Sequence, residues 1–147
     1  MSKHNEMRKP VVLIVEDEPL VSEMAAEALA DQGFEIVSAT RAEDALDHLR
    51  SGAPVDVLFT DINLAGAMDG SALALIARQL HPKLPVVYTS GLATPGQMRA
   101  VNDATFVPKP YDPFEVAFMI ESIVGGCRRR AQRAAAICSI DRQRPDA

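Results

Sequence analysis

The chain has 147 residues, of which 48% are hydrophobic and 24% charged, and its formal net charge is -5. This length suits one ordinary domain with a full hydrophobic core, and no apolar run approaches the roughly 18 residues of a membrane-spanning helix. The first nine residues lack the apolar stretch of a secretory signal, and the two cysteines lie too near the C-terminus to staple a fold. We therefore expect a cytoplasmic domain with reduced thiols.

Charge is distributed unevenly along the chain. Residues 127–147 contain six arginines and two aspartates, a net charge of +4, so residues 1–126 carry -9. An acidic body of this kind argues against nucleic acid as the main ligand. We expect a flexible N-terminus over residues 1–9, a folded domain over 10–125, and a basic tail or short helix over 126–147.

Five apolar runs predict β-strands. In chain order they cover residues 11–15, 34–39, 55–59, 85–88 and 105–107. The runs are mostly continuous rather than alternating, which is typical of strands buried on both faces and therefore of a parallel sheet.

Helical patterns follow these runs. The first predicted helix begins at Pro19, and the second follows a capping box formed by Thr40 and Glu43. The third begins near Leu73 and the fourth at residue 94. The fifth begins at Pro113, with Asp112 as its N-cap. In the same order, these five helices are predicted to end at a Gly33 cap, at Ser51-Gly52, at Pro82, at residue 101 and at Gly125-Gly126. Because parallel neighbours need right-handed crossovers, this alternation predicts an open, doubly wound α/β domain with helices on both faces of its sheet.

In such sheets ligands bind at the carboxyl ends of the strands. The polar residues at those ends are Glu16 and Asp17 after the first strand, Asp61 after the third, Ser90 after the fourth and Lys109 after the fifth. Carboxylates that meet at one rim repel one another unless a cation intervenes, and Mg²⁺ prefers oxygen ligands. The acidic residues therefore predict a partial magnesium site that a phosphate would complete. A hydroxyl and an ammonium group suit the phosphate oxygens.

This set of residues, in this order, resembles the receiver domain of two-component response regulators. The resemblance covers residues 10 to about 125 and implies a flavodoxin-like (βα)5 fold with strand order 2-1-3-4-5. It also implies that Asp61 accepts a phosphoryl group from a histidine kinase or a phosphotransfer protein. Because few residues follow Gly125, we expect a stand-alone receiver.

The resemblance further implies a role for each rim residue. Asp17, Asp61, the backbone carbonyl of Asn63, and Glu16 through a water would hold Mg²⁺. Lys109 would then pair with the phosphoryl oxygens.

Three residues are implied in a conformational switch. Ser90 would donate a hydrogen bond to the new phosphoryl group, and Phe106 occupies the aromatic position whose burial accompanies switching in this family. The Lys109-Pro110 bond would be cis, which is accessible because the bond precedes a proline.

We expect the protein to be a signalling phosphoacceptor rather than an enzyme, with intrinsic Mg²⁺-dependent self-phosphorylation and autodephosphorylation. Its output would be contact with a downstream protein target, without a DNA-binding domain or a membrane. Self-association would use the face of the fourth helix, fifth strand and fifth helix.

Other functions stay open. A haloacid-dehalogenase-like phosphatase also combines an aspartate nucleophile, Mg²⁺ and a lysine, but it would want a second acid where Asn63 stands and a cap region. A flavodoxin-like flavin carrier would need hydroxyl- and glycine-rich phosphate loops. A receiver-like scaffold would act without phosphorylation. Taken singly, Asp61 would most often cap a turn, so the functional interpretation depends on the whole set.

Overall fold

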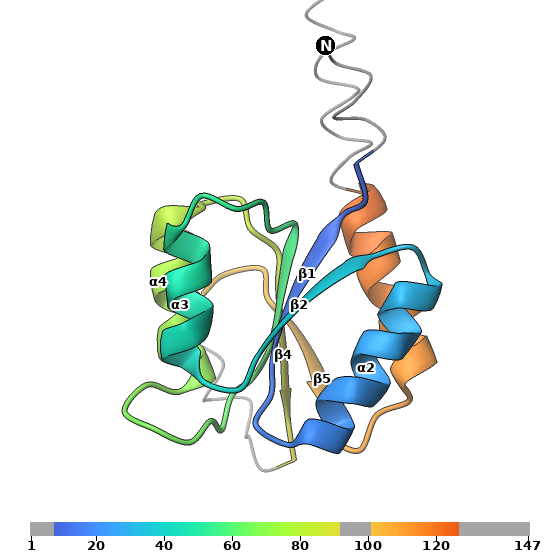
Figure 1. Ribbon diagram of the computed structural model, residues 1–147, viewed down its shortest axis with the longest axis horizontal. Coiled ribbons are helices and arrows are strands. Elements are labelled where there is room, and N and C mark those ends of the chain that lie inside the picture. The colour runs from blue at the N-terminus through green and yellow to red at the C-terminus, as the bar shows by residue number, and fades with distance from the viewer. Residues whose placement is uncertain (1–7, 92–100, 127–147) are drawn as a thin grey trace, which may run out of the picture.

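The computed structural model describes residues 8–91 and 101–126. Its centre is a five-stranded parallel sheet (Figure 1). The strands are β1 (Val11–Val15), β2 (Glu35–Ala39), β3 (Val57–Asp61), β4 (Val86–Ser90) and β5 (Thr105–Pro108). They pair in the order β2-β1-β3-β4-β5, with every pair parallel. The predicted fold class and strand order are confirmed.

Helices cover both faces of the sheet. Figure 1 shows α3 (Ala42–Arg50) and α4 (Gly70–Leu80) side by side on one face, and α2 (Pro19–Asp31) with a C-terminal helix, described over residues 113–126, on the other. The helix predicted over 94–101 lies outside the described residues except for its last position, and so does the basic tail. The predicted self-association face therefore falls partly outside the described residues. No helix within residues 8–91 and 101–126 is long and apolar enough to span a membrane.

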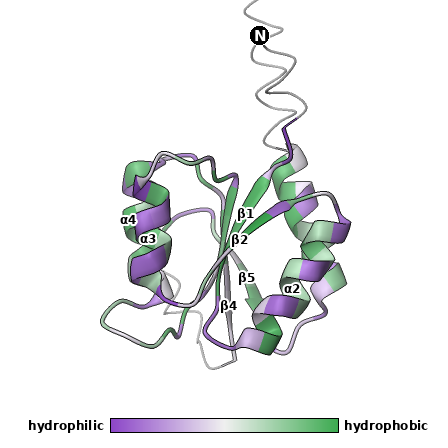
Figure 2. Cartoon of the chain, in the orientation of Figure 1, coloured by the Kyte–Doolittle hydropathy of each residue, from purple (hydrophilic) through white to green (hydrophobic). Residues whose placement is uncertain are grey.

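Side-chain alternation along the strands divides the hydrophobic core into two halves. In β1, Leu13 and Val15 pack toward α3 and α4, whereas Val12 and Ile14 pack toward α2 and the C-terminal helix. Figure 2 shows the central strands as largely hydrophobic between helices of mixed character. Each fully buried side chain of this size contributes roughly 1.5–3 kcal/mol. Burial on both faces thus fixes β1, and with it the position of Glu16 at its end.

The strands β3 and β4 extend further toward the carboxyl edge than their apolar runs indicate. β3 starts at Val57 rather than at residue 55 and ends at Asp61, and β4 ends at Ser90 rather than at residue 88. The extra residues are polar but buried, since Thr60 is 0% and Ser90 is 2% exposed. Hydropathy places these strand ends too early because it does not register polar groups that are buried at a functional edge.

The capping box predicted for α3 is wrong. Arg41, not Thr40, is the N-cap; its backbone is extended (φ -129°, ψ 149°), and no side-chain cap bond forms. Glu43 instead lies with its Oε2 3.3 Å from Nε of Arg41. The predicted end at Ser51-Gly52 is confirmed, because α3 ends at Arg50 and Ser51 is its C-cap.

The C-terminal helix starts as predicted but continues further. The backbone N–H of Phe114 donates to Oδ1 of Asp112 at 2.9 Å, which is the expected N-cap bond. Gly125 and Gly126, predicted to end the helix, are both helical. Buried Ile120 and Val124 anchor the preceding turn to the core, and such packing outweighs the poor helix propensity of glycine.

Candidate functional site

The carboxyl ends of four strands meet at one edge of the sheet. Asp61 and Ser90 are the last residues of β3 and β4, and Glu16 directly follows β1. The backbone pairing continues beyond β5, since the N–H of Lys109 donates to the carbonyl of Ser90 at 3.1 Å. The residues that the sequence placed at a common rim therefore do lie together.

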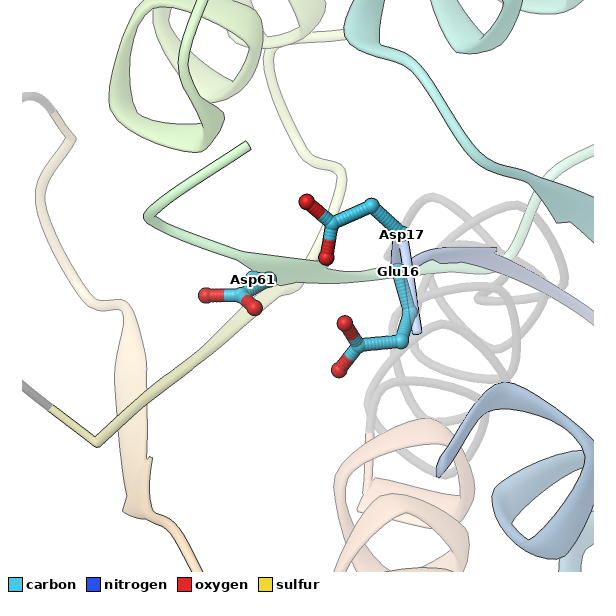
Figure 3. A group of neighbouring side chains, drawn as sticks. All are labelled: Glu16, Asp17 and Asp61. Carbon is cyan, nitrogen blue, oxygen red and sulfur yellow. The ribbon is translucent and has the colours of Figure 1, made fainter. Parts of the chain in front are cut away.

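Three carboxylates converge at this rim (Figure 3). One oxygen from each of Glu16, Asp17 and Asp61 lies within 4.8 Å of the others. Glu16 and Asp61 are buried, at 3% and 5% exposure, whereas Asp17 is exposed. An all-oxygen set with one solvent-facing member suits a hard cation that keeps part of its water shell. The residues present therefore fit Mg²⁺.

Lys109 bridges the two buried carboxylates. Its Nζ lies 2.6 Å from Oε1 of Glu16 and donates to Oδ2 of Asp61 at 2.8 Å. Burial by itself would lower the pKa of Lys109, but the hydrogen bonds and charges of Asp61 and Glu16 outweigh burial and raise this pKa above its ordinary value. Lys109 therefore keeps a positive charge beside Asp61 at neutral pH.

The carboxyl group of Glu16 lies in a nearly water-free position, at 3% exposure. Burial raises the pKa of Glu16, and the nearby Asp61 acts in the same direction, while hydrogen bonds from Lys109 and from the backbone of Glu18 oppose the rise. The Glu18 N–H donates to Oε2 of Glu16 at 3.2 Å. The pKa of Glu16 is therefore above its ordinary value, and the contacts with Lys109 and Glu18 limit the rise.

The position of Asp61 is fixed by contacts on both sides. Its Oδ1 accepts a hydrogen bond from the backbone N–H of Asn63 at 3.0 Å, and its Oδ2 accepts from Lys109. Behind it, a Cβ on Gly70 would lie 1.9 Å from the backbone oxygen of Asp61, so only glycine lets α4 begin this close. Sequence reasoning missed Gly70. The signal available was an N-cap, Asp69, followed by a residue without a side chain.

The side chain of Asn63 makes a contact that the sequence did not suggest. Its Nδ2 donates to Oγ of Ser90 at 2.6 Å. Sequence reasoning gave Asn63 only a backbone role, and the two residues are 27 positions apart. Only the path of the loop between β3 and α4 brings them together.

The residues implied in switching lie next to this rim. Phe106 is paired in register with Tyr88 and packs, half-buried, against the core half under α3 and α4. The Lys109-Pro110 peptide bond is cis. Any movement of Ser90 and Phe106 stays a prediction.

Comparison with known proteins agrees with this arrangement. The profile of the response regulator receiver domain matches residues 12–121. The chain belongs to this family. The resemblance of the sequence to a receiver domain is thereby confirmed. The three carboxylates lie at the carboxyl edge of the sheet, at the ends of β1 and β3, between which the strand order reverses.

Similar proteins include larger regulators that contain a receiver. The chain is 32% identical to the nitrogen assimilation regulatory protein NtrX of Azorhizobium caulinodans over 127 residues, which covers 82% of this chain and 27% of NtrX. It is 30% identical to the DNA-binding transcriptional regulator NtrC of Escherichia coli K12 over 129 residues, covering 86% and 27%. The chain therefore spans 27% of the length of these two relatives.

The match with solved receiver structures covers almost the whole length of those structures. A response regulator receiver protein from Sinorhizobium medicae is 27% identical with a TM-score of 0.76, covering 81% of this chain and 97% of that one. The receiver domain of the hybrid histidine kinase CckA is 31% identical with a TM-score of 0.67, covering 78% and 98%. The described residues therefore share the fold of these receiver structures.

Proposed function

We propose that residues 10–125 form a receiver whose Asp61 accepts a phosphoryl group from a histidine kinase or phosphotransfer protein, and that the phosphorylated form signals through altered protein contacts. The observation that supports this most directly is the position of Asp61, which lies 2.8 Å from the ammonium of Lys109 and within 4.8 Å of the carboxylates of Glu16 and Asp17. Fold, family and local chemistry all agree on this reaction.

The transfer needs positioning and charge neutralisation more than it needs a base. A carboxylate oxygen of Asp61 attacks phosphorus, forming the new P–O bond. The P–N bond to the donor histidine breaks, and the departing imidazole keeps the electron pair and takes up a proton. Lys109, already hydrogen-bonded to Asp61, then neutralises phosphoryl oxygens. Glu16, Asp17, Asp61 and the carbonyl of Asn63 would hold Mg²⁺, which supplies further neutralisation when bound.

Signalling would follow as a population shift between two packings. The hydroxyl of Ser90 donates to the phosphoryl group and draws the end of β4 inward. Phe106, half-buried against the core, repacks with it. A protein target then binds one packing better than the other.

The face beside Asp61 suits a donor protein with a basic, partly apolar surface. The large exposed apolar side chains on α2 and the C-terminal helix are Leu20, Met24, Phe114 and Phe118, at 69%, 49%, 56% and 59% exposure. The described parts of these helices contain glutamates and an aspartate but no lysine or arginine. A groove of about 430 Å³, lined in part by Met24, Tyr111 and Lys109, joins this face to the site. Charge complementarity therefore favours a basic partner.

A phosphatase of the haloacid dehalogenase type is less consistent with the site. That chemistry would want an acid at position 63, whereas the side-chain amide of Asn63 donates to Ser90. A scaffold that works without phosphorylation would not need Lys109 to be held between two buried carboxylates.

Acetyl phosphate tests the proposal directly. With Mg²⁺, the intact mass of the wild type should increase by one phosphoryl group, as acetate leaves and the acyl phosphate forms on Asp61. Asp61→Asn should show no addition, while Asp44→Asn, a matched change on the exposed surface of α3, should react like the wild type. Addition to Asp61→Asn would refute the assignment.

A further inference from the structure

Four hydrogen bonds link Asp61, Asn63, Ser90 and Lys109 into a closed ring at the rim of the sheet. The Asn63 N–H donates to Asp61 Oδ1 at 3.0 Å, and the Asn63 side chain donates to Ser90 Oγ at 2.6 Å. The Lys109 N–H donates to the Ser90 carbonyl at 3.1 Å, and Lys109 Nζ donates to Asp61 Oδ2 at 2.8 Å. Asn63 and Lys109 each contribute one backbone and one side-chain contact to this ring.

The direction of the bond between Asn63 and Ser90 matters chemically. An amide nitrogen is only a donor, so the bond uses a lone pair of the serine oxygen and not its proton. Phosphoryl oxygens are only acceptors, and a hydrogen bond from Ser90 to them requires that proton. The contact at Asn63 is therefore compatible with donation by Ser90 to a phosphoryl group. An acceptor at position 63 would instead compete for the same proton.

Burial makes this arrangement effective. Ser90 is 2% exposed, so water has little access to reorient its hydroxyl. Asn63 is exposed on the loop after β3, and its backbone N–H is anchored by the phosphoacceptor itself. The loop thus couples Asp61 and Ser90 through one residue.

We propose that the side-chain amide of Asn63 is a positioning residue, which orients the hydroxyl of Ser90 toward the phosphoryl group on Asp61 and so sets the fraction of phosphorylated molecules in the switched packing. This inference rests on the proposed function and adds regulation to the same site. Asn63 acts through Ser90, so its effect must vanish when the hydroxyl of Ser90 is absent.

A double-mutant cycle tests this coupling. The variants are Asn63→Ala, Ser90→Ala and the double variant, each saturated with Mg²⁺ and beryllofluoride as the phosphoryl mimic. Backbone amide NMR signals of Gly91 and Lys109 report the ratio of switched to resting molecules. We expect Asn63→Ala to lower this ratio about fivefold, the effect of one ordinary hydrogen bond, and to have no further effect in the Ser90→Ala background.

A second variant fixes the direction of the bond. Asn63→Asp keeps the side-chain shape but presents only acceptors, so it should lower the ratio more than Asn63→Ala does. Equal effects of Asn63→Ala with and without the Ser90 hydroxyl would overturn the inference, as would an Asn63→Asp ratio at or above the wild-type value. These results leave the proposed function intact. A wild type that neither binds beryllofluoride nor reacts with acetyl phosphate would overturn both.

Discussion

Replacing Lys109 by methionine should expose how strongly the carboxylates at the rim repel one another. The change removes the cation that lies 2.6 Å from Glu16 and 2.8 Å from Asp61. At an effective dielectric constant of about 20, each of these contacts is worth on the order of 6 kcal/mol before desolvation is subtracted. Removing one partner of a buried pair costs about 3–5 kcal/mol. Because the Lys109 side chain is not fully buried but keeps 17% exposure, water can partly compensate the charges, and we expect a loss near the lower limit, about 3 kcal/mol at pH 7 without divalent metal.

The loss should depend on pH. Burial raises the pKa of Glu16, and the hydrogen bond from Lys109 is the main contact that opposes this rise. The variant lacks that hydrogen bond, so the pKa of Glu16 rises further. The native variant then binds a proton more tightly than its unfolded chain, and its stability increases as the pH falls through the raised pKa. In the wild type, the raised pKa of Lys109 means that its stabilisation is fully present below the ordinary lysine value and is lost only as the pH rises through the raised one.

Urea unfolding of both proteins in a chelating buffer, at pH 7 and at about pH 5, measures this difference. Lys83→Met, at an exposed lysine in the loop before β4, is the matched control and should behave like the wild type. Added Mg²⁺ should return part of the stability lost in Lys109→Met, because ligand binding to the native state stabilises it. The reasoning would be refuted if Lys109→Met were as stable as the wild type at pH 7, or if its loss of unfolding free energy relative to the wild type were larger at pH ~5 than at pH 7.

Three further changes test other features. Gly70→Ala should destabilise the fold by about 1–3 kcal/mol and slow labelling by acetyl phosphate, because its Cβ would displace the Asp61 peptide; unfolding and labelling as in the wild type would contradict the close contact. Met24→Glu should weaken phosphorylation by a basic donor protein but not by acetyl phosphate, with Leu75→Glu, similarly exposed on α4, as control; equal effects would argue against the proposed face. Burial, followed by the charge of Glu16, raises the pKa of Tyr111 to about 12, so stability present below pH ~10 should be lost toward pH ~12, a loss that Tyr111→Phe should not show in pH-dependent unfolding.

The sequence located the rim of the site well because parallel strands force their carboxyl ends onto one edge. Glu16, Asp61 and Lys109 could be assigned to that edge from strand positions alone, without knowing any loop. The side-chain contact between Asn63 and Ser90, and the close approach of Gly70, could not. Both depend on the three-dimensional path of the loop over residues 62–69, for which hydropathy carries no signal.

Local errors had local causes. Thr40 has the sequence of a cap, but the extended backbone at Arg41 starts the helix one residue later. The apolar run of the fourth strand stops at residue 88, yet β4 continues to the buried Ser90. Composition identified the strands, whereas tertiary contacts decided where each one stopped.

The absence of lysine and arginine from the described parts of α2 and the C-terminal helix should affect which donor proteins can approach Asp61. Because the charged side chains on these described helical parts are all negative, they should repel an acidic protein that approaches this face, so that the face discriminates by exclusion as well as by attraction. Such exclusion weakens as ionic strength rises. Cross-talk with unsuitable donors should therefore increase with salt, while the acid-rimmed surface insulates the pathway under dilute conditions.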